Sequence, residues 1–529
     1  MSRSPALGKI LIAAAALAVA TGLPALAGRV VLSQKSGAFK FEGDLKSYDG
    51  ASFVMETPTG TITLSANDFL CTVGDCPKPA RSAAAATAPP AVRFTMFGAT
   101  SIGDDLIPAL FRAFGSSRGE RTEEVFRTQS SKTHFTLYKD REAPTVELDM
   151  QRDGTANGLK ALAKGEVHVA MAGRAITPEE IRLMPPVKAG QAARIDATVV
   201  ALDGVAVLVS PRSNIDALTH AQLGAIFAGR ITDWSELGRD PGRIRVYAPD
   251  VGNGTLDIFI ATVLKPQGLL LSPYATRIHD FAKMSDLVAG DPNAIAIAPA
   301  AFLRNAKPVG LQDTCGIVTQ LSPFTVKSEE YPMSHRAYLY TAGPVPSVVA
   351  DFIRFTQSAE AQTTVVDKQF VNQAILAGAL GSETARIATL LEPGLAPPEQ
   401  ALRQRLATEL AAARRLSVTL RFASGTSVLD ERARQDITRL AAWLRAPQNA
   451  GATAILAGFT DQLGNMQGNV ALSQKRAEQV RQAVLTAGGG GIRPERVEVR
   501  GYGPIAPVAC NAEPQRQNFN RRVEVWFRN

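Results

Sequence analysis

The stretch GFTDQLGNMQGNVALSQKR, residues 458–476, decides the fold of the C-terminal part of this chain. It follows a short apolar run at 454–457 and leads into apolar residues at helical spacing, which predicts a strand, a polar loop and a helix. Asp461 then lies at the strand end and Arg476 on the helix. A fixed carboxylate beside a fixed, forked guanidinium suits a zwitterionic ligand such as an amino-acid headgroup. The alternative interpretation is an ion pair that pins the loop to the helix.

The region from residue 416 to the C-terminus resembles the OmpA-like peptidoglycan-binding domain. The residues that carry the resemblance are Gly458, Thr460, Asp461, Gly464, Asn469, Leu472, Ser473, Arg476, Ala477, Gly501, Tyr502, Gly503, Pro507, Asn520, Arg521, Arg522, Val523 and Glu524. The resemblance implies that Asp461 and Arg476 grip the diaminopimelate of the peptide stem. It also assigns Asn469, Arg521 and Arg522 to the ligand pocket, with ordinary surface charge as the alternative for the last two.

The remaining pattern of this region supports the same fold. Alternating apolar residues at 416–422, 496–501 and 522–527 predict strands, and the apolar face of 430–444 predicts a helix. Together with the strand and helix around 454–476, the expected order is βαβαββ over residues 416–529.

Length and charge limit the classes of protein to consider. At roughly 150 residues per domain, 529 residues suggest three or four domains. The net charge of +8 is mild for this length, and the basic residues are scattered rather than gathered in tracts. We therefore expect no nucleic-acid partner.

The first 27 residues have the features of an export signal. Arg3 and Lys9 precede an apolar run at 10–20, and Ala25 and Ala27 offer a small-residue cleavage site. The sequence predicts a signal peptide at 1–27 and a mature start near Gly28. An uncleaved membrane helix is the alternative. No later segment is apolar and long enough to predict a membrane span.

The four cysteines fit an oxidising compartment. Cys71 and Cys76 flank a turn-like loop and are expected to form a disulfide. Cys315 and Cys510 lie in different predicted domains, and the sequence favours two free or buried thiols over an interdomain bridge. Histidine and cysteine spacing predicts no metal site, and no cofactor is expected.

Composition divides the rest of the chain. Short alternating strands predict a small β-rich module at 28–79, which is an adaptor, an interaction module or a cap on the next domain. Residues 80–90 are rich in Ala and Pro and predict a linker. Residues 379–415 predict a helical connector, with helices at 382–391 and 398–415, whose second helix carries an apolar stripe that packs on a neighbour.

The largest unit spans residues 91–378. Strand-like runs at 94–97, 167–170, 205–209, 244–247 and 295–298 alternate with helical stretches such as 104–114 and 157–164. This alternation predicts an α/β fold with mainly parallel sheets. Several strand-to-helix junctions carry Gly, Ser or Thr, at 98–103, 154–158 and 252–255. Helix starts present free backbone N–H groups, so three such junctions in one cleft would bind an oxyanion, although each alone is more often an N-cap.

The order of these stretches resembles the periplasmic phosphate-binding (PstS-like) substrate-binding proteins. The matching stretches are GATSIGDDLIPAL, GTANGLKALAKGEVHVAMAGRAITPEE, ALDGVAVLVSP, LTHAQLGAIFAGRITDWSELG, RIRVYAPDVGNGTLDIF and EYPMSHRAYLY. The resemblance implies a two-lobed, type II-like binding-protein fold whose lobes are joined by crossing strands and close over a ligand. The implied oxyanion contacts are Thr100, Ser101, Thr155, Gly173, Asn253, Gly254 and Thr255.

Two departures from the family pattern concern the identity of the ligand. The aspartate that accepts the proton of hydrogen phosphate in many members is missing at Ala172-Gly173-Arg174, and the family's arginine before the 252–255 loop is replaced near Pro249. Arg174 is then a substitute cation for the oxyanion, or else part of a surface salt bridge.

The first functional hypothesis is therefore a periplasmic, non-enzymatic receptor for an inorganic oxyanion, phosphate first, tethered to peptidoglycan in a Gram-negative-type envelope. An ABC permease is a further candidate partner. The alternative is a structural or envelope-assembly protein that uses the binding-protein fold as a scaffold. A third hypothesis, an enzyme such as a phosphatase, lacks a nucleophile motif or a metal-ligand spacing in the sequence.

Overall fold

The computed structural model describes residues 28–34, 40–48, 52–58, 60–66, 68–74, 76, 91–126, 131–139, 143–184, 195–251, 253–379, 383, 386, 397–422, 429, 431–513 and 516–529. The signal peptide expected at 1–27, the linker expected at 80–90 and most of the helix expected at 382–391 lie outside these residues. The chain divides into two compact units, residues 1–89 and 90–529, which are described separately.

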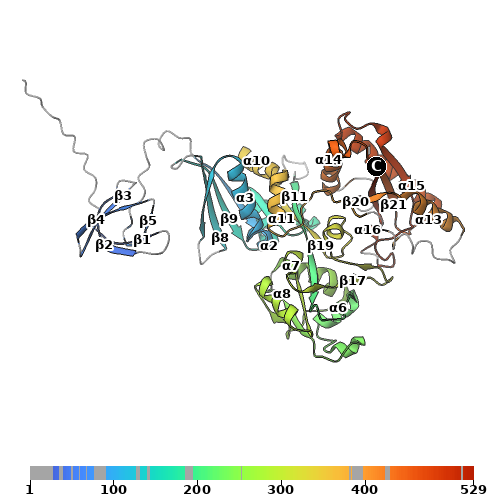
Figure 1. Cartoon of the computed structure of the whole chain (residues 1–529), viewed down its shortest axis with the longest axis horizontal. Helices are drawn as coiled ribbons and strands as arrows, with labels where there is room; N and C mark the ends of the chain where they lie inside the picture. Colours follow the sequence, from blue (N-terminus) through green and yellow to red (C-terminus); the bar gives the residue numbers. More distant parts are fainter. Residues whose placement is uncertain are drawn as a thin grey trace, which may run out of the picture. The chain divides into compact units, whose positions relative to one another are not determined.

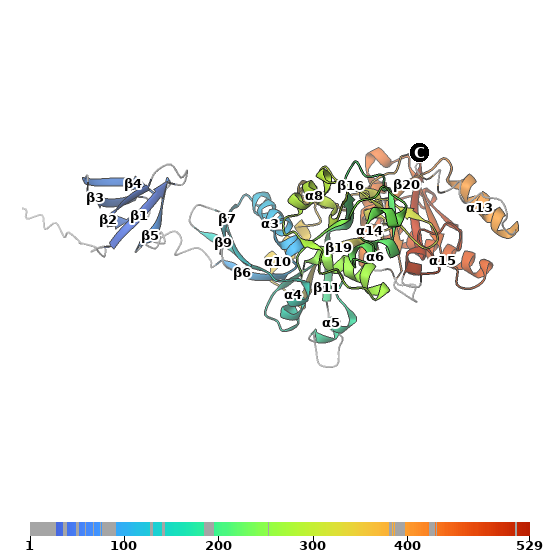
Figure 2. The same cartoon turned by 90° about the horizontal axis from the view of Figure 1, so that it is seen from below.

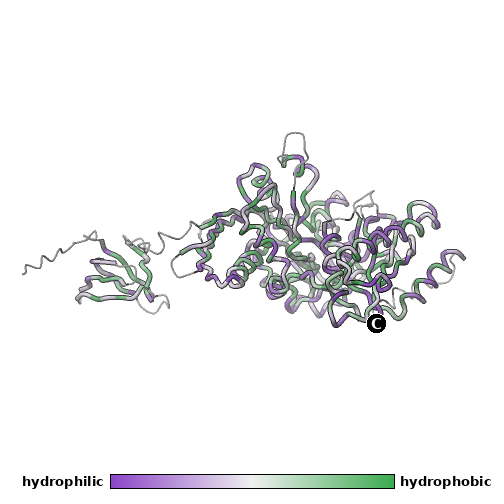
Figure 3. Tube along the Cα trace, turned by 90° about the horizontal axis from the view of Figure 1, so that it is seen from above, coloured by the Kyte–Doolittle hydropathy of each residue, from purple (hydrophilic) through white to green (hydrophobic). Residues whose placement is uncertain are grey.

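The first unit is an antiparallel sheet in the order β4-β3-β2-β1-β5. Its strands are β1 (Gly28–Gln34), β2 (Lys40–Tyr48), β3 (Ser52–Thr57), β4 (Gly60–Ser65) and β5 (Phe69–Gly74). Buried residues alternate with more exposed ones along β2 and β3. Figure 3 shows both hydrophilic and hydrophobic segments in this small sheet. Leu32, Leu45 and Met55 are at the centre of its core. A disulfide joins Cys71 to Cys76, which confirms the predicted pairing.

The second unit begins with a large mixed sheet in the order β14-β13-β15-β11-β19-β10-β6-β9-β8-β7, with β16 paired to β11 (Figure 1). Its strands are β6 (Val92–Gly98), β7 (Arg121–Phe126), β8 (Lys132–Tyr138), β9 (Pro144–Arg152), β10 (Val169–Ala172), β11 (Ile195–Val209), β13 (Arg245–Ala248), β14 (Thr276–Arg277), β15 (Ala294–Pro299), β16 (Lys307–Pro308) and β19 (Ser334–Ala342). A small sheet pairs β12 (Ala217–Thr219), β17 (Gly310–Gln312) and β18 (Val318–Thr319).

Strand β11 crosses between two lobes. Residues 195–204 pair with β19, and residues 205–209 pair with β15. Because both pairings are antiparallel, the sheet is mixed, and the expectation of a mainly parallel sheet is wrong for this part. The parallel pairs are confined to each lobe, β10 with β6 and β6 with β9 in the first, and β13 with β14 and with β15 in the second. The expected two-lobed α/β architecture with crossing strands is confirmed.

Helices cover each lobe around its own core. They are α2 (Thr100–Gly103), α3 (Leu106–Ser117), α4 (Thr155–Ala163), α5 (Pro178–Leu183), α6 (His220–Phe227), α7 (Gly254–Phe259), α8 (Phe281–Gly290), α9 (Pro323–Lys327), α10 (Ser347–Phe355) and α11 (Ala359–Asp367). In the first lobe Phe111 packs edge-on against Phe135 and Phe352. In the second lobe Phe227 and Phe259 pack together in a separate cluster.

The C-terminal part has the expected βαβαββ order, with a short additional helix before the last strand, and a sheet in the order β20-β23-β21-β22 (Figure 2). Its elements are α13 (Pro397–Leu410), β20 (Arg414–Arg421), α14 (Glu431–Arg445), β21 (Thr453–Phe459), α15 (Met466–Ala487), β22 (Val497–Gly501), α16 (Gln517–Asn520) and β23 (Arg522–Arg528). None of the helices that the structure describes combines the length and the apolar character needed to cross a bilayer.

Successive residues of β21 face opposite sides of this sheet. Ala454 and Leu456 lie in the cluster with α14 and α15, whereas Ile455 and Ala457 lie in the cluster with α13. The apolar stripe of α13, made by Leu402, Leu406 and Leu410, is buried there, so this helix packs on the C-terminal domain as its spacing predicts. The helix is shorter than expected, because the chain turns into β20 from residue 414.

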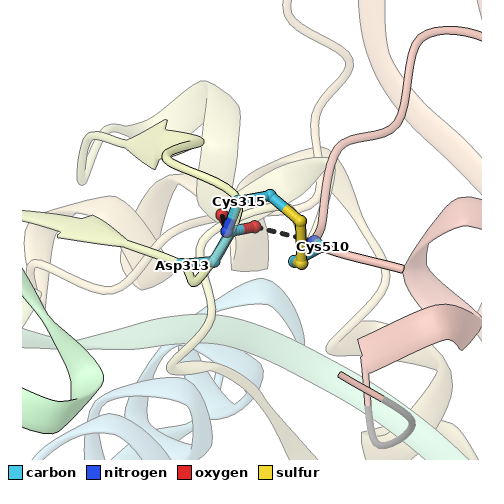
Figure 4. A group of neighbouring side chains, drawn as sticks. All are labelled: Asp313, Cys315 and Cys510. Atoms are coloured by element: carbon cyan, nitrogen blue, oxygen red, sulfur yellow. Dashed lines mark hydrogen bonds between the residues drawn. A yellow bond between two sulfur atoms is a disulfide. The ribbon is translucent and has the colours of Figure 1, made fainter. Parts of the chain in front are cut away.

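The second lobe and the C-terminal domain are covalently joined by a disulfide between Cys315 and Cys510 (Figure 4). The preference for two unlinked thiols is therefore wrong. The carboxylate of Asp313 holds both sides of this joint, because it accepts hydrogen bonds from the backbone N–H of Cys315 at 3.0 Å and of Cys510 at 2.7 Å. The two cysteines are 195 residues apart, so nothing local in the sequence indicates their proximity.

A buried ionic network ties the C-terminal domain to the segment just before β19. Arg415, which is 1% exposed, pairs with Glu330 and lies 3.4 Å from Glu524. Arg432 pairs with Glu329 at 2.6 Å. Burial opposes ionisation of Glu330, but the charge and hydrogen bond of Arg415, together with the charge of Arg386, lower the pKa of this carboxyl. A charge taken out of water must be paired, so the network holds the joint in one arrangement.

Candidate functional site

The first candidate site lies where β6 leads into α2. Gly98 has a φ of +145°, and a Cβ there would lie 1.9 Å from the backbone oxygen of Met171 in β10. Only glycine allows this close approach. The backbone N–H of Ala99 donates to the same oxygen at 2.9 Å, which holds the start of α2 against the end of β10.

Four of the residues predicted to bind an oxyanion lie close together. A Cβ on Gly173 would lie 3.3 Å from Oγ of Ser101, and a Cβ on Gly254 would lie 3.5 Å from the same atom. Oγ of Thr155 accepts a hydrogen bond from the N–H of Gly173 at 3.1 Å. Because Gly254 belongs to the second lobe and the other three to the first, this group spans the two lobes.

The helix starts at this group differ in their free donors. Neither α2, preceded by Ala99, nor α4, preceded by Gly154, has a side chain that caps its first turn. Thr100 is the first residue of α2 and is half-buried. At α7, by contrast, the Asn253 side chain accepts from the N–H of Thr255 at 2.9 Å, and Thr255 is buried. The uncapped N–H groups of the first lobe are therefore the more available anion donors.

Arg174 follows β10 beside this group but is occupied by a carboxylate. Its two terminal nitrogens each donate to Glu180 at 2.8 Å, and Glu180 also closes a capping box with Thr177 at the start of α5. The hydrogen bond from Arg174 lowers the pKa of Glu180, although burial opposes the shift. The substitute cation that the sequence suggests is thus already neutralised by a local ion pair.

A carboxyl that sequence reasoning overlooked lies near the same arginine. Asp257 belongs to the first turn of α7, and its backbone N–H donates to the carbonyl oxygen of Asn253 at 3.0 Å. Burial raises the pKa of Asp257, while the charge of Arg174 lowers it. Asp257 could have been noticed in the sequence, because it lies two residues after the Gly254-Thr255 pair. Its interaction with Arg174, however, depends on the two lobes facing each other.

The second candidate site contains Asp461, at the end of β21. Its Oδ2 accepts from Nη1 of Arg521 at 2.8 Å, and its Oδ1 accepts from the N–H of Leu463 at 3.1 Å. The loop-to-helix ion pair offered as the alternative, between Asp461 and Arg476, does not form; the partner comes from the segment before the last strand.

Arg476 on α15 is 7% exposed and lies over the ring of Phe422, with its guanidinium carbon 5.2 Å from the ring centre. Its Nε and Nη1 are buried and make no hydrogen bond to the residues that the structure describes. Burial and the nearby charge of Arg521 lower the pKa of Arg476, and Asp461 partly offsets them. Buried donors without partners favour binding of an acceptor-bearing ligand.

The other two predicted wall contacts are placed differently. Nδ2 of Asn469 donates to the carbonyl oxygen of Leu463 at 3.0 Å, so Asn469 shapes the loop that carries Asp461. Arg522 has no exposed surface and donates to Glu524 at 2.6 Å and to the carbonyl oxygen of Ala506 at 2.9 Å. This side chain belongs to the buried ionic network. For Arg522, both the expected ligand contact and the alternative of ordinary surface charge are therefore wrong.

A cavity of about 340 Å³ lies where the first lobe, the segment leading into β19 and the C-terminal domain meet. Arg174 lines it from the first lobe and Phe422, the residue under Arg476, lines it from the C-terminal domain. Arg336 and Arg421 are further lining residues. The sequence does not indicate that Arg174 and Phe422 line the same cavity, because this depends on how the first lobe and the C-terminal domain pack together.

The crossing strands carry a buried acid and base where they leave the first lobe. Asp203 in β11 pairs in register with His335 in β19, and the side chains approach to 3.7 Å. Burial raises the pKa of Asp203 to about 7 and lowers that of His335 to about 4. Between about pH 4 and pH 7 the carboxyl is therefore mostly protonated and the imidazole mostly neutral.

Comparison with known proteins agrees with the division of the second unit into a two-lobed part and a C-terminal domain. Residues 131–360 match the PBP superfamily domain model, and residues 421–521 match the OmpA family model. Over 241 residues the chain is 25% identical to the phosphate-binding protein PstS of Bacillus subtilis, covering 43% of this chain and 71% of that protein. Over 111 residues it is 33% identical to outer membrane porin F of Pseudomonas fluorescens, covering 21% of this chain and 32% of that protein.

A solved structure described as an ABC-type phosphate transport receptor from Vibrio cholerae aligns with a TM-score of 0.40 and 19% identity, over 53% of this chain and 99% of that chain. Several curated relatives are matched over less than half of their own length, porin F among them. From residue 131 onward, the chain carries a PBP superfamily domain followed by a domain of the OmpA family.

Proposed function

We propose that this protein is a periplasmic receptor for an inorganic oxyanion, phosphate first among them, held non-covalently to peptidoglycan by its C-terminal domain. The observation that supports the oxyanion half is the approach of Ser101, Thr155 and Gly173 in one lobe to Gly254 in the other. Hydroxyl donors and uncapped helix starts that meet between two lobes suit a small anion that closes the lobes on binding. In this proposal the protein binds the anion without converting it, and either hands it to an ABC permease or reports on its presence.

The oxyanion half is tested by calorimetric titration of the full chain with phosphate and with sulfate. The full chain is used because residues 90–529 form one compact unit. Ser101→Ala removes one donor to a charged ligand, and we expect binding about 10- to 100-fold weaker. Ser117→Ala, an exposed serine of α3, is the matched control and is expected to bind like the wild type. Absence of heat with either anion would refute this half.

The wall half is supported by Arg476, a buried guanidinium with unpartnered nitrogens, close to the acidic side chain of Asp461. A diaminopimelate headgroup carries a carboxylate for Arg476 and an ammonium for Asp461. Arg521, now paired with Asp461, would share the same ligand.

Co-sedimentation of the full chain with purified peptidoglycan tests the wall half. We expect Asp461→Ala and Arg476→Ala to abolish sedimentation, since each leaves a charge of the ligand unpaired. Arg528→Gln is the matched control, because Arg528 pairs with Thr453 at the end of the sheet opposite Asp461. Sedimentation of both site variants at the wild-type level would contradict the assignment.

A second candidate function is a scaffold in envelope assembly, with no oxyanion bound. One observation favours it: Arg174 is already neutralised by Glu180, so the cleft gains no free cation from this residue. The two functions make opposite predictions for the phosphate titration, while both retain attachment to the wall.

A further inference from the structure

A separate cavity of about 460 Å³ lies between the second lobe and the C-terminal domain. Thr314 and His220 line it from the lobe, and Glu513 and Arg516 line it from the domain. Pockets of a few hundred Å³ with a small number of convergent polar groups are typical of small-molecule sites. The residues predicted to contact the oxyanion or the wall do not line it.

Arg516 is the buried cation of this cavity. The residue is 8% exposed, and its Nε and Nη1 are buried without a hydrogen bond to any described residue. The nearest carboxylate oxygens, of Glu513 and Asp313, lie 3.7 and 3.8 Å from Nη1, beyond hydrogen-bonding distance. A guanidinium left with unused donors in a buried position is costly, which favours a ligand that supplies the missing acceptor.

Glu513 provides a fixed anion beside this cation. Its Oε1 accepts from both the N–H and the hydroxyl of Thr314, at 3.0 and 2.8 Å. Burial opposes ionisation, but these hydrogen bonds and the charge of Arg516 lower the pKa of Glu513, so it is ionised at neutral pH. Its Oε2 accepts no hydrogen bond from Arg516 and is available to a donor on a ligand.

His220 completes the polar wall as a neutral group. Burial, followed by the charge of Arg516, lowers the pKa of its imidazole, although the backbone of Gln312 and the charge of Glu513 partly offset this. Both ring nitrogens are buried and make no hydrogen bond that meets normal geometry among the described residues. The cavity also has apolar lining, with Val263, Pro266 and Phe519 among its residues, and the Phe519 ring lies under the guanidinium of Arg516.

The charges decide the class of ligand. Arg516 and Glu513 contribute one positive and one negative charge, and Asp313 nearby adds a second negative charge whose oxygens accept backbone N–H groups. A simple anion would therefore be repelled, and a simple cation would leave the donors of Arg516 unused. A carboxylate for Arg516 together with an ammonium for Glu513 satisfies both.

We propose that this cavity binds a small zwitterion, a free α-amino acid, with its carboxylate on Arg516, its ammonium on Glu513 and its side chain against the apolar wall. The site is preformed, because Thr314 and Glu513 are hydrogen-bonded to each other and each lies within a few residues of the Cys315–Cys510 disulfide. A site preformed in this way loses less entropy on binding. The proposal is independent of the oxyanion and wall functions.

The test is calorimetric titration of the oxidised full chain with glycine, L-alanine and L-leucine, and with succinate and putrescine as ligands bearing only one kind of charge. We expect saturable binding of the amino acids, strongest for L-leucine, and none of succinate or putrescine. Arg516→Gln and Glu513→Gln are each expected to weaken binding about 10- to 100-fold.

Two controls separate binding from folding. Ala261→Phe adds bulk to the lining of the cavity and leaves Arg516 and Glu513 in place; it is expected to abolish amino-acid binding while leaving the urea unfolding midpoint near that of the wild type. Phosphate titration and wall sedimentation of the same variants are expected to be unchanged. Failure of all three amino acids to bind at millimolar concentration, equal binding of succinate, or wild-type binding by Ala261→Phe would each overturn the proposal.

Discussion

Removal of the Cys315–Cys510 disulfide should strongly destabilise the second unit, although Cys315 itself is exposed. The crosslink closes a loop of 195 residues, and the chain-entropy relation gives a stabilisation of about 5 kcal/mol for a loop of that length. The same relation gives about 2 kcal/mol for Cys71–Cys76, whose cysteines are separated by 5 residues. The larger value is an upper limit, since the buried network around Arg415 also holds the joint.

The variant to compare is Cys315→Ala with Cys510→Ala. Alanine is preferred because Cys510 is 1% exposed, and serine would bury a hydroxyl there. Urea unfolding followed by tryptophan fluorescence reports on this unit, because the tryptophans, including Trp526, lie within it. Cys71→Ala with Cys76→Ala is the matched control and should leave the fluorescence midpoint unchanged.

Two measurements would contradict this reasoning. One is reaction of two thiols with Ellman's reagent in the unreduced, denatured wild-type protein, which would mean that the bridge does not form. The other is an unfolding midpoint of the Cys315→Ala, Cys510→Ala variant equal to that of the wild type at equal urea dependence. The second result would place the stability of the joint in the ionic network alone.

Three further predictions concern buried groups. Because the pKa of Asp203 rises from 3.8 to about 7 on folding, its stabilisation is lost as pH rises over that window, whereas that of His335, whose pKa falls from 6.5 to about 4, is lost as pH falls. The two pH dependences have opposite signs. With Asp203→Asn only the His335 effect remains, and the free energy of unfolding should rise by about 1.4 kcal/mol per pH unit between pH 4 and 6.5; with His335→Gln only the Asp203 effect remains, and it should fall with pH. Parallel pH profiles for the two variants would refute this. Arg415→Met should cost about 3–5 kcal/mol in urea unfolding, because it leaves buried carboxylates without their cation, and a neutral effect would show that they protonate instead. Leu406→Ala should cost about 2–5 kcal/mol, because the side chain is 2% exposed between α13 and the sheet, and an effect below 1 kcal/mol would mean that α13 is not packed there in solution.

Much of each domain followed from local patterns. The alternation of Val523, Val525 and Phe527 predicted the last strand and its buried face, and the spacing of Leu402, Leu406 and Leu410 predicted a packed helix. Such patterns are readable because a residue's position along a helix or strand fixes the side on which it lies.

The candidate sites were predicted less completely. The string of matching residues located Asp461 and Arg476, but the partner of Asp461 is Arg521, and Arg522 is buried on Glu524. Both arginines stand side by side in the sequence, and only the twist of the chain into β23 turns one toward the loop and the other into the interior.

The sequence by itself determined the types and order of the elements, the two-lobed α/β part, the C-terminal βαβαββ domain and the pairing of Cys71 with Cys76. Only the tertiary structure decided how the second lobe and the C-terminal domain meet: the bond between Cys315 and Cys510, the network around Arg415 and the cavity beneath Arg516. The physical reason is that periodicity and turn chemistry act over a few residues. Contacts between groups that are 85 to 195 residues apart depend instead on which surfaces gain most by burying their apolar area and pairing their charges.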